Sequence, residues 1–322
     1  MARRFSPAVF ASLIACATIT AQAQDWPTKP VRIVVPFAPG GVSDIIARTV
    51  AASMSQGLGQ PVVVDNKPGS QGFIGVQNAK SSAADGYTLV LMSSSVGCVN
   101  PALRKDVPFD ISKDFDPVGM VGAAPLVMVV APDMPVNSVA QFIEYAKASP
   151  NQVNYSSPGI GGSAHLYGSV MNARNGLDMQ LVPYQGGVPA LQAVISGEVQ
   201  MTFADMGSAT GQLQAEKLKA LAIAGEKRWP KFPNVPTFAE AGYPINLVGW
   251  VGLMTPAGTP QPVIDRLNAE LRKFAQAPEN HDRLLISGVQ PNAGSPADMA
   301  HAIQEGCPQW ANAIKEAGIK PE

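Results

Sequence analysis

Charged side chains are scarce in this sequence. Asp, Glu, Lys and Arg together make up 15% of the 322 residues, whereas hydrophobic residues make up 46%. A chain this apolar can bury enough surface to offset the entropy lost on ordering, which excludes a disordered protein. The 23 basic residues nearly balance the 24 acidic ones and are not concentrated in any segment, so the positive field that attracts nucleic acid is missing. At about 100–200 residues per domain, the length predicts two domains or one large one.

Residues for metal binding and covalent catalysis are scarce as well. The chain has three histidines, His165, His281 and His301, and neither an H-E-x-x-H nor a C-x-x-C pattern, so a tight metal site lacks ligands. It also lacks the G-x-S-x-G nucleophile motif and the Walker A motif. We therefore predict a protein that is not an enzyme and needs no metal or cofactor. An exported hydrolase that uses Ser163 and His165 is a rival hypothesis.

One glycine pattern resembles a dinucleotide-binding fingerprint. Gly159-Ile160-Gly161-Gly162-Ser163-Ala164 has the G-x-G-x-x-A spacing, and Asp178 follows it. In the fingerprint the acidic residue ends the second strand, whereas Asp178 precedes the strand expected at 180–182. Short glycine patterns also recur by chance, so we do not predict a nicotinamide cofactor.

The N-terminus has the layout of a secretory signal peptide. Arg3 and Arg4 precede an apolar run over residues 8–17, and Ala21-Gln22-Ala23 forms a small-x-small cleavage site, so we predict a signal peptide at residues 1–23. The run is too short for a bilayer span, which needs about 20 apolar residues. Leu13-Ile14-Ala15-Cys16 loosely resembles a lipoprotein box, so lipid anchoring at Cys16 is an alternative to a freely exported protein.

Two cysteines, Cys98 and Cys307, remain after the signal peptide is removed. An exported protein reaches a compartment in which disulfides persist, but a bridge forms only if the fold brings the two Cα atoms within about 7 Å. The sequence leaves a disulfide and two buried thiols equally open.

From Pro30 the chain alternates short apolar strands with amphipathic helices. The strand 31–35 is followed by a glycine turn and a helix, for which Ser43 or Asp44 is the expected N-cap and Ile45, Ile46, Thr49, Val50 and Met54 have helical spacing. Repeated units of this kind indicate an α/β fold with mainly parallel sheets. Apolar stretches near 118–130 and 247–254 are expected to cross between two lobes as a hinge, with lobe 1 formed by 24–124 and 249–322 and lobe 2 by 125–248.

Glycine and hydroxyl residues gather where strands of both lobes end. A loop with small side chains at a helix N-terminus exposes backbone N–H groups and favours an anion, and in open α/β sheets ligands lie beyond the carboxyl ends of strands. We therefore predict a carboxylate clamp; for each loop, helix capping alone is the alternative. The candidate ligand-binding residues are Pro39, Gly40, Gly41, Ser43, Asp44, Ser93, Ser95, Ser157, Gly161, Gly162, Ser163, His165 and Asp205. For Asp205, an N-cap of the following helix is the alternative.

Several sequence blocks together resemble the Bug (TctC-like) family, the extracytoplasmic solute-binding receptors of tripartite tricarboxylate transporters. The blocks occur in one order along the chain: 26–30, 33–41, Asp65-Asn66-Lys67-Pro68-Gly69, Asp85-Gly86-Tyr87-Thr88-Leu89, Tyr155-Ser156-Ser157-Pro158-Gly159, 182–186, 233–237 and Pro256-Ala257-Gly258-Thr259-Pro260.

The resemblance implies a type II periplasmic binding-protein fold with two lobes and a two-strand hinge. It implies a periplasmic monomer that captures a small organic carboxylate and delivers it to membrane subunits of a transporter, with one carboxylate held by the loops at 40–44 and 157–163. A ligand-sensing receptor that uses the same cleft for a signalling partner is the alternative function.

Overall fold

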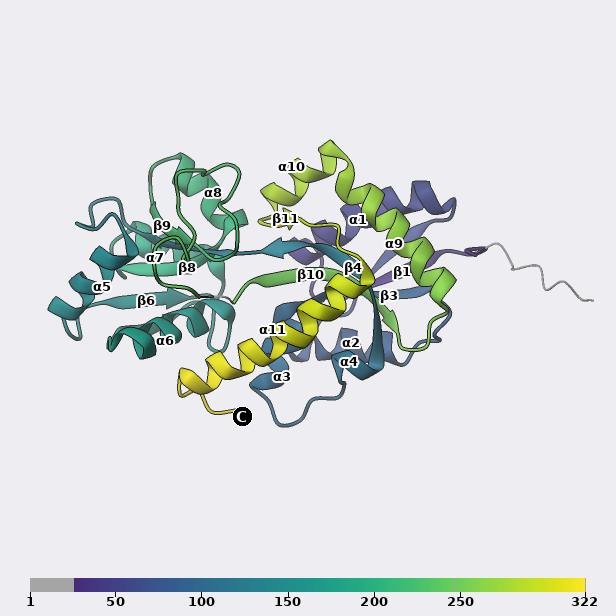
Figure 1. Ribbon diagram of the computed structural model, residues 1–322, viewed down its shortest axis with the longest axis horizontal. Coiled ribbons are helices and arrows are strands. Elements are labelled where there is room, and N and C mark those ends of the chain that lie inside the picture. The colour runs from purple at the N-terminus through teal and green to yellow at the C-terminus, as the bar shows by residue number, and fades with distance from the viewer. Residues whose placement is uncertain (1–25, 246, 322) are drawn as a thin grey trace, which may run out of the picture.

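The computed structural model describes residues 26–245 and 247–321, so the predictions for residues 1–23 and Cys16 lie outside the described residues. Two β-sheets lie side by side along the long axis (Figure 1). The first has the strand order β11-β4-β10-β3-β1-β2, with bounds β1 Val31–Val35, β2 Val62–Asn66, β3 Thr88–Ser93, β4 Phe115–Ala124, β10 Gly249–Pro256 and β11 Gln290–Pro291. The second has the order β7-β6-β8-β5-β9, with bounds β5 Leu126–Val130, β6 Asn154–Ser157, β7 Gln180–Pro183, β8 Met201–Asp205 and β9 Lys219–Ile223.

Both sheets are mixed. Strands β1, β2 and β3 run parallel to one another, as do β6, β7 and β8. One strand in the middle of each sheet runs the other way: β10 pairs antiparallel with β3 and β4, and β5 pairs antiparallel with β8 and β9. The parallel part of each sheet thus ends in the predicted binding loops.

Helices cover both faces of the first sheet. The helices α1 (Val42–Leu58), α9 (Gln261–Gln276) and α10 (Pro278–Ile286) pack on one face, where the core contains Ile33 and Val35. The other face carries η1 (Ser70–Gly72), α2 (Phe73–Lys80), η2 (Ser95–Val99), α3 (Asn100–Ala102), α4 (Ile111–Asp114) and α11 (Pro296–Glu316). Val34 points to this second core, as the two-residue period of a strand requires.

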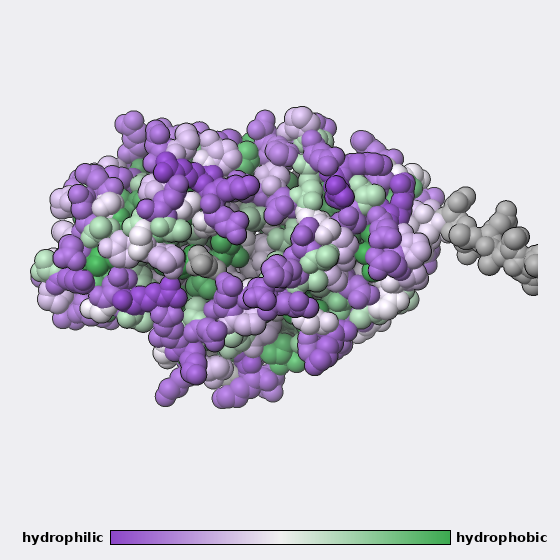
Figure 2. All heavy atoms as spheres, in the orientation of Figure 1, coloured by the Kyte–Doolittle hydropathy of each residue, from purple (hydrophilic) through white to green (hydrophobic). Residues whose placement is uncertain are grey.

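The second sheet is covered in the same way. The helices α5 (Val139–Ala148) and α6 (Ser163–Asn175) pack on one face, and α7 (Gly187–Ile195) and α8 (Met206–Gln214) on the other. The core under α5 and α6 is continuous with the core under α2 and α11 of the first sheet, so one apolar cluster runs through both lobes. Polar and charged residues cover most of the face shown in Figure 2, with hydrophobic residues visible in small groups between them.

Two strand connections and one helix link the lobes. The chain passes from β4 to β5 at Pro125, and β10 pairs with β4 so that Gly249 lies opposite Ala124. Helix α11 crosses the front of the first sheet and reaches α6 (Figure 1). There Trp310 packs against Tyr167 with ring centroids 6.2 Å apart, and Arg174 donates to both carboxylate oxygens of Glu316 at 2.8 and 3.1 Å.

A disulfide joins Cys98 to Cys307, with the Cα atoms 4.7 Å apart. The sequence leaves a disulfide and two buried thiols equally open, and the structure shows the disulfide. It ties η2, the turn that follows β3, to helix α11 across a sequence separation of 209 residues. Within the residues that the structure describes, we find no helix long and apolar enough to cross a membrane.

Candidate functional site

Two loops in different lobes have the same backbone conformation. Gly40 and Gly161 have φ of 84° and 81°, in the left-handed region that favours glycine. The next residues, Gly41 and Gly162, have φ/ψ of −81°/172° and −77°/171° and are the N-caps of α1 and α6. Each loop follows a parallel strand of its own sheet, β1 or β6, so the two lobes present matching glycine turns.

A side chain four residues further on holds each turn. The N–H of Gly40 donates to Asp44 Oδ2 at 2.9 Å, and the N–H of Gly161 donates to His165 Nδ1 at 3.0 Å. Because each bond closes a short loop onto the first turn of its helix, the glycine N–H does not point freely toward a ligand. Asp44 and His165, two of the predicted site residues, therefore position the loops.

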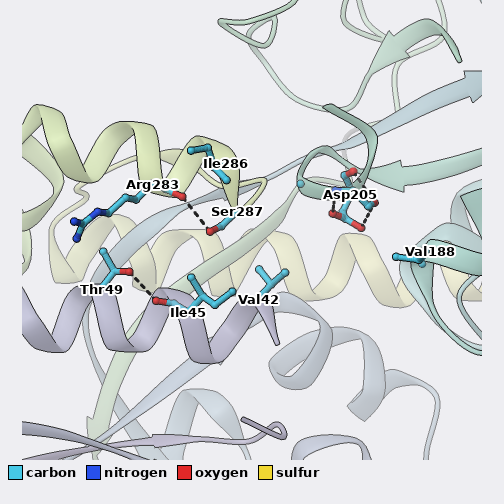
Figure 3. Close-up of a pocket in the computed structure, with 11 residues that line it drawn as sticks. Val42, Ile45, Thr49, Val188, Asp205, Arg283, Ile286 and Ser287 are labelled. Carbon is cyan, nitrogen blue, oxygen red and sulfur yellow. Dashed lines mark hydrogen bonds between the residues drawn. The ribbon is translucent and has the colours of Figure 1, made fainter. Parts of the chain in front are cut away.

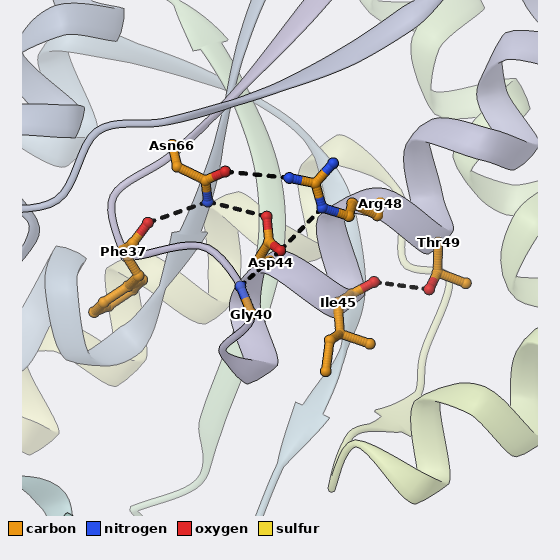
Figure 4. A network of polar contacts seen from close by, with 7 residues as sticks. All are labelled: Phe37, Gly40, Asp44, Ile45, Arg48, Thr49 and Asn66. Atoms are coloured by element: carbon orange, nitrogen blue, oxygen red, sulfur yellow. Dashed lines mark hydrogen bonds and ion pairs between the residues drawn. The ribbon is translucent and has the colours of Figure 1, made fainter.

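Asp44 lies at the centre of a polar network (Figure 4). The residue is 3% exposed, and its carboxylate accepts from Arg48 Nε at 2.9 Å and from Asn66 Nδ2 at 3.0 Å as well as from Gly40. The same Asn66 amide donates to the Phe37 carbonyl at 3.2 Å, which connects the loop to the end of β1. The Arg48 hydrogen bond lowers the pKa of Asp44, against burial, which raises it. Asp44 therefore acts as a buried, paired carboxylate.

His165 is half-buried, and desolvation lowers its pKa below the ordinary value. A neutral imidazole whose Nδ1 accepts a hydrogen bond must carry its proton on Nε2. His165 thus locks its loop with one ring nitrogen and keeps an N–H donor on the other.

The helices α1 and α6 begin without a capping side chain, and their first bonds run from Ile45 N–H to the Gly41 carbonyl and from Leu166 N–H to the Gly162 carbonyl. The N–H groups of the first turn have no partner within the helix and carry partial positive charge. The expected N-cap at Ser43 or Asp44 is wrong: α1 begins at Val42, because the Asp44 carboxylate turns inward to the Gly40 loop. Ser43 and Ser163 lie half-buried in these first turns.

Two of the remaining predicted serines, Ser157 and Ser93, form hydrogen bonds with the backbone. Ser157 is buried and its hydroxyl donates to the Gly159 carbonyl at 2.7 Å, inside the second glycine loop. Ser93 Oγ accepts from Val96 N–H at 3.4 Å, where the chain turns from β3 into η2. Ser95 is half-buried in η2, and Pro39 is exposed beside Gly40.

Asp205 caps helix α8. Its carboxylate accepts from Ser208 N–H at 2.8 Å and from Ser208 Oγ at 2.7 Å, which confirms the N-cap alternative. It also lines a cavity of about 670 Å³ between the lobes (Figure 3). The cavity is bounded by α1 and α10 of the first lobe and by the starts of α7 and α8 of the second.

The sequence prediction missed most of the residues that line this cavity. They include four apolar side chains, Val42 and Ile45 on α1, Val188 on α7 and Ile286 on α10, with Thr49, Ser208, Arg283 and Ser287 beside them. The lobes approach closely next to it, since a Cβ on Gly207 would lie 3.1 Å from Ser287. The lobes also approach at Gly161, because a Cβ there would lie 3.3 Å from Leu103 Cδ1. Among the described residues, no group of three or more His, Cys, Asp or Glu side chains is placed to hold a metal ion.

Residues 46–319 match the family model described as "Tripartite tricarboxylate transporter family receptor". The chain belongs to this family of receptors. The receptor is 35% identical to protein BugT of Bordetella pertussis over 97% of each chain. Its structure is similar to that of the R. palustris protein Rpa4515 with adipate, at a TM-score of 0.79 and 33% identity over 92% of this chain and 100% of that one. MatC from Rhodopseudomonas palustris with bound malate gives a TM-score of 0.73 and 30% identity over 90% and 100%.

These comparisons confirm the Bug/TctC family and the two-lobe binding-protein fold of the receptor. Family and fold are those of substrate-binding receptors rather than enzymes. The geometry also gives no support to a hydrolase. Ser163 and His165 are two positions apart on α6, a spacing that turns side chains to different faces of a helix, and His165 Nδ1 is occupied by Gly161.

Proposed function

We propose that this receptor is exported, binds a small organic carboxylate between its lobes and delivers it to the membrane subunits of a transporter. The observation that supports the proposal most strongly is the pair of glycine-capped helices, α1 and α6, with matching backbone angles in opposite lobes. An N-cap is usually a side chain that accepts from the first turn. Because glycine has no side chain, the N–H groups of the first turn are available to an external anion.

In the proposed site the carboxylate is neutralised by dipoles. The N–H groups of the first turns of α1 and α6, the hydroxyls of Ser43 and Ser163 and the Nε2–H of His165 supply donors. Gly40, Gly41, Gly161 and Gly162 let the anion approach the backbone, and Asp44 and Ser157 position the loops. Pro39, Ser93, Ser95 and Asp205 complete the proposed site at the ends of neighbouring strands.

We further propose that the lobes are residues 24–124 with 249–322 and residues 125–248, and that they close by bending at the paired strands. Support comes from the sheets: the strands of the first lie within 31–124 and 249–291, and those of the second within 126–223. A ligand that contacts both lobes favours the closed form, because its contacts differ between the two states. Export through a signal peptide at residues 1–23, a periplasmic location and a monomeric state are parts of the same proposal.

The test is calorimetry on the mature protein with a panel of mono- and dicarboxylates, alongside Gly41→Val and Gly162→Val. Both glycines have backbone angles that any residue adopts, and an added Cβ meets nothing at Gly162 and only the Ala38 carbonyl, at 3.7 Å, at Gly41. We expect normal folding and loss of carboxylate binding in both variants. Gly306→Val, in a helical position with open space around it, is the control. Wild-type protein that binds no carboxylate, or variants that bind as wild type does, would remove the proposal.

A further inference from the structure

Four exposed, large apolar side chains line the cavity between the lobes. Val42 is 47% exposed, Ile45 48%, Val188 74% and Ile286 64%. Single exposed apolar residues are ordinary on a protein surface, but several that line one cavity indicate a binding surface. Here the group lines a concave site, where ligand pockets are generally apolar.

The four side chains come from both lobes and face one space. Val42 and Ile45 are three residues apart on α1 and therefore share a face of that helix. Figure 3 shows them below Ile286 of α10, with Val188 of α7 across the cavity beside Asp205. Val42 is also the first residue of α1, so its backbone N–H lies at the proposed carboxylate end while its side chain lies in the cavity.

Charged groups in the cavity do not suit a second carboxylate. Among the described residues that line it, the charged ones are Asp205 and Arg283. The Asp205 carboxylate is an anion, already bonded to Ser208. The guanidinium of Arg283 points along α1 toward Thr49, away from Asp205 (Figure 3). A second carboxylate placed among the four apolar side chains would lose its hydration without gaining a cation.

We infer that the ligand is an amphipathic monocarboxylate: its carboxylate lies at the glycine loops and an aliphatic tail of several carbons lies along α1, between Val42, Ile45, Val188 and Ile286. This inference rests on the proposed function and specifies its substrate class. Val42, Ile45 and Thr49 line the cavity over about 10 Å of α1, at 1.5 Å per residue, and the first two give the tail an apolar wall next to the glycine loop.

The first experiment measures affinity by calorimetry for butanoate, hexanoate and octanoate, and for hexanedioate as the dicarboxylate matched to hexanoate. Burying one methylene contributes enough free energy for about a fourfold gain in affinity, so we expect the dissociation constant to fall about fourfold per added carbon until the cavity is filled. Hexanedioate should bind at least about tenfold more weakly than hexanoate, because its second carboxylate stays unpaired.

Matched variants locate the tail. Ile45→Ser and Val188→Ser should weaken octanoate binding far more than butanoate binding and so flatten the dependence on chain length. Ile74→Ser and Val63→Ser are the controls, since these side chains are 52% and 47% exposed but lie on α2 and β2, outside the cavity lining. An equal loss for all ligands in the cavity variants would mean that these residues act only in lobe closure, and the inference would be wrong.

The failures of the two proposals are distinguishable. If no carboxylate in the series binds, the proposed function fails and the inference with it. If hexanedioate binds more tightly than hexanoate, and Arg283→Gln removes that preference, the site takes dicarboxylates through Arg283. That result overturns the inference and leaves the proposed function standing.

Discussion

Gly162→Asp should stabilise the receptor and abolish its binding. Gly162 is the N-cap of α6, its φ/ψ of −77°/171° suits any residue, and no atom lies within 4 Å of an added Cβ. An aspartate there can accept from the free N–H groups of Ala164 or His165, as N-cap side chains do. The same carboxylate would take the place that we assign to the ligand.

The substitution should raise the stability of the receptor slightly and lower its affinity for the ligand strongly. Replacing an N-cap glycine by aspartate contributes a few tenths of a kcal/mol, and the negative charge at the helix N-terminus adds about 0.3–1 kcal/mol. The melting temperature should therefore rise by about 1–3 °C. For binding, two carboxylates about 4 Å apart repel by about 4 kcal/mol at an effective dielectric constant of 20. We expect affinity to fall at least about 100-fold.

The assay combines a thermal melt without ligand and calorimetry with the carboxylate that binds wild type best. Gly162→Asn is the control, because it can cap the helix without the charge and should keep more affinity than Gly162→Asp. Unchanged affinity in Gly162→Asp would refute the placement of the carboxylate at α6. A loss of more than about 1 kcal/mol in stability would refute the expectation that an aspartate at position 162 caps α6 without strain.

Further predictions concern the groups that hold the loops and the fold. Asp44→Ala leaves Gly40 N–H and the Asn66 amide without their acceptor, so urea titration should show a loss of about 2–3 kcal/mol; a loss below about 0.5 kcal/mol would contradict the network. Because the pKa of Asp44 is lowered by Arg48, its contribution is complete above about pH 4 and fades as acid protonates it, so wild type and Asp44→Asn should converge in stability below that pH. His165→Asn keeps an acceptor for Gly161 and should bind, whereas His165→Leu should lose affinity in the same calorimetric assay. Replacing both Cys98 and Cys307 by alanine opens a loop spanning a sequence separation of 209 residues, for which chain entropy gives about 5 kcal/mol; urea midpoints of the variant and of reduced wild type should fall together.

Much of the fold could be predicted because the strands are strongly apolar and the turns carry glycine. The long strands β4 and β10 could be predicted for the same reason, since they are apolar runs without helical periodicity. The mixture of parallel and antiparallel pairing could not be predicted, because the direction of a strand relative to its neighbours depends on how segments far apart in the sequence come together. The Cys98–Cys307 bridge likewise depends on α11 returning to the end of β3, which no local pattern encodes.

The glycine loops could be predicted from the sequence, but the hydrogen bonds of their polar residues could not. Asp44 and His165 follow glycines four positions earlier and look like ligand-binding residues in the sequence. In the structure each turns back to bond its glycine, a choice that depends on the close turn formed at Gly40 or Gly161. Asp44 is also buried, and Arg48 and Asn66 donate further hydrogen bonds to its carboxylate.

The sequence of α1 contains apolar residues on two faces of the helix, and helical spacing alone does not show which of them line the cavity. Ile45 and Ile46 are adjacent, so both cannot face the same core. In α1 the buried stripe runs through Ile46, Val50 and Met54, while Val42, Ile45 and Thr49 form a second stripe that lines the cavity. One stripe is enough to dock a helix on a sheet. The second stripe, two of whose three side chains are apolar, directly follows the glycine loop that we propose for the carboxylate, and it therefore supports the aliphatic tail that we infer for the ligand.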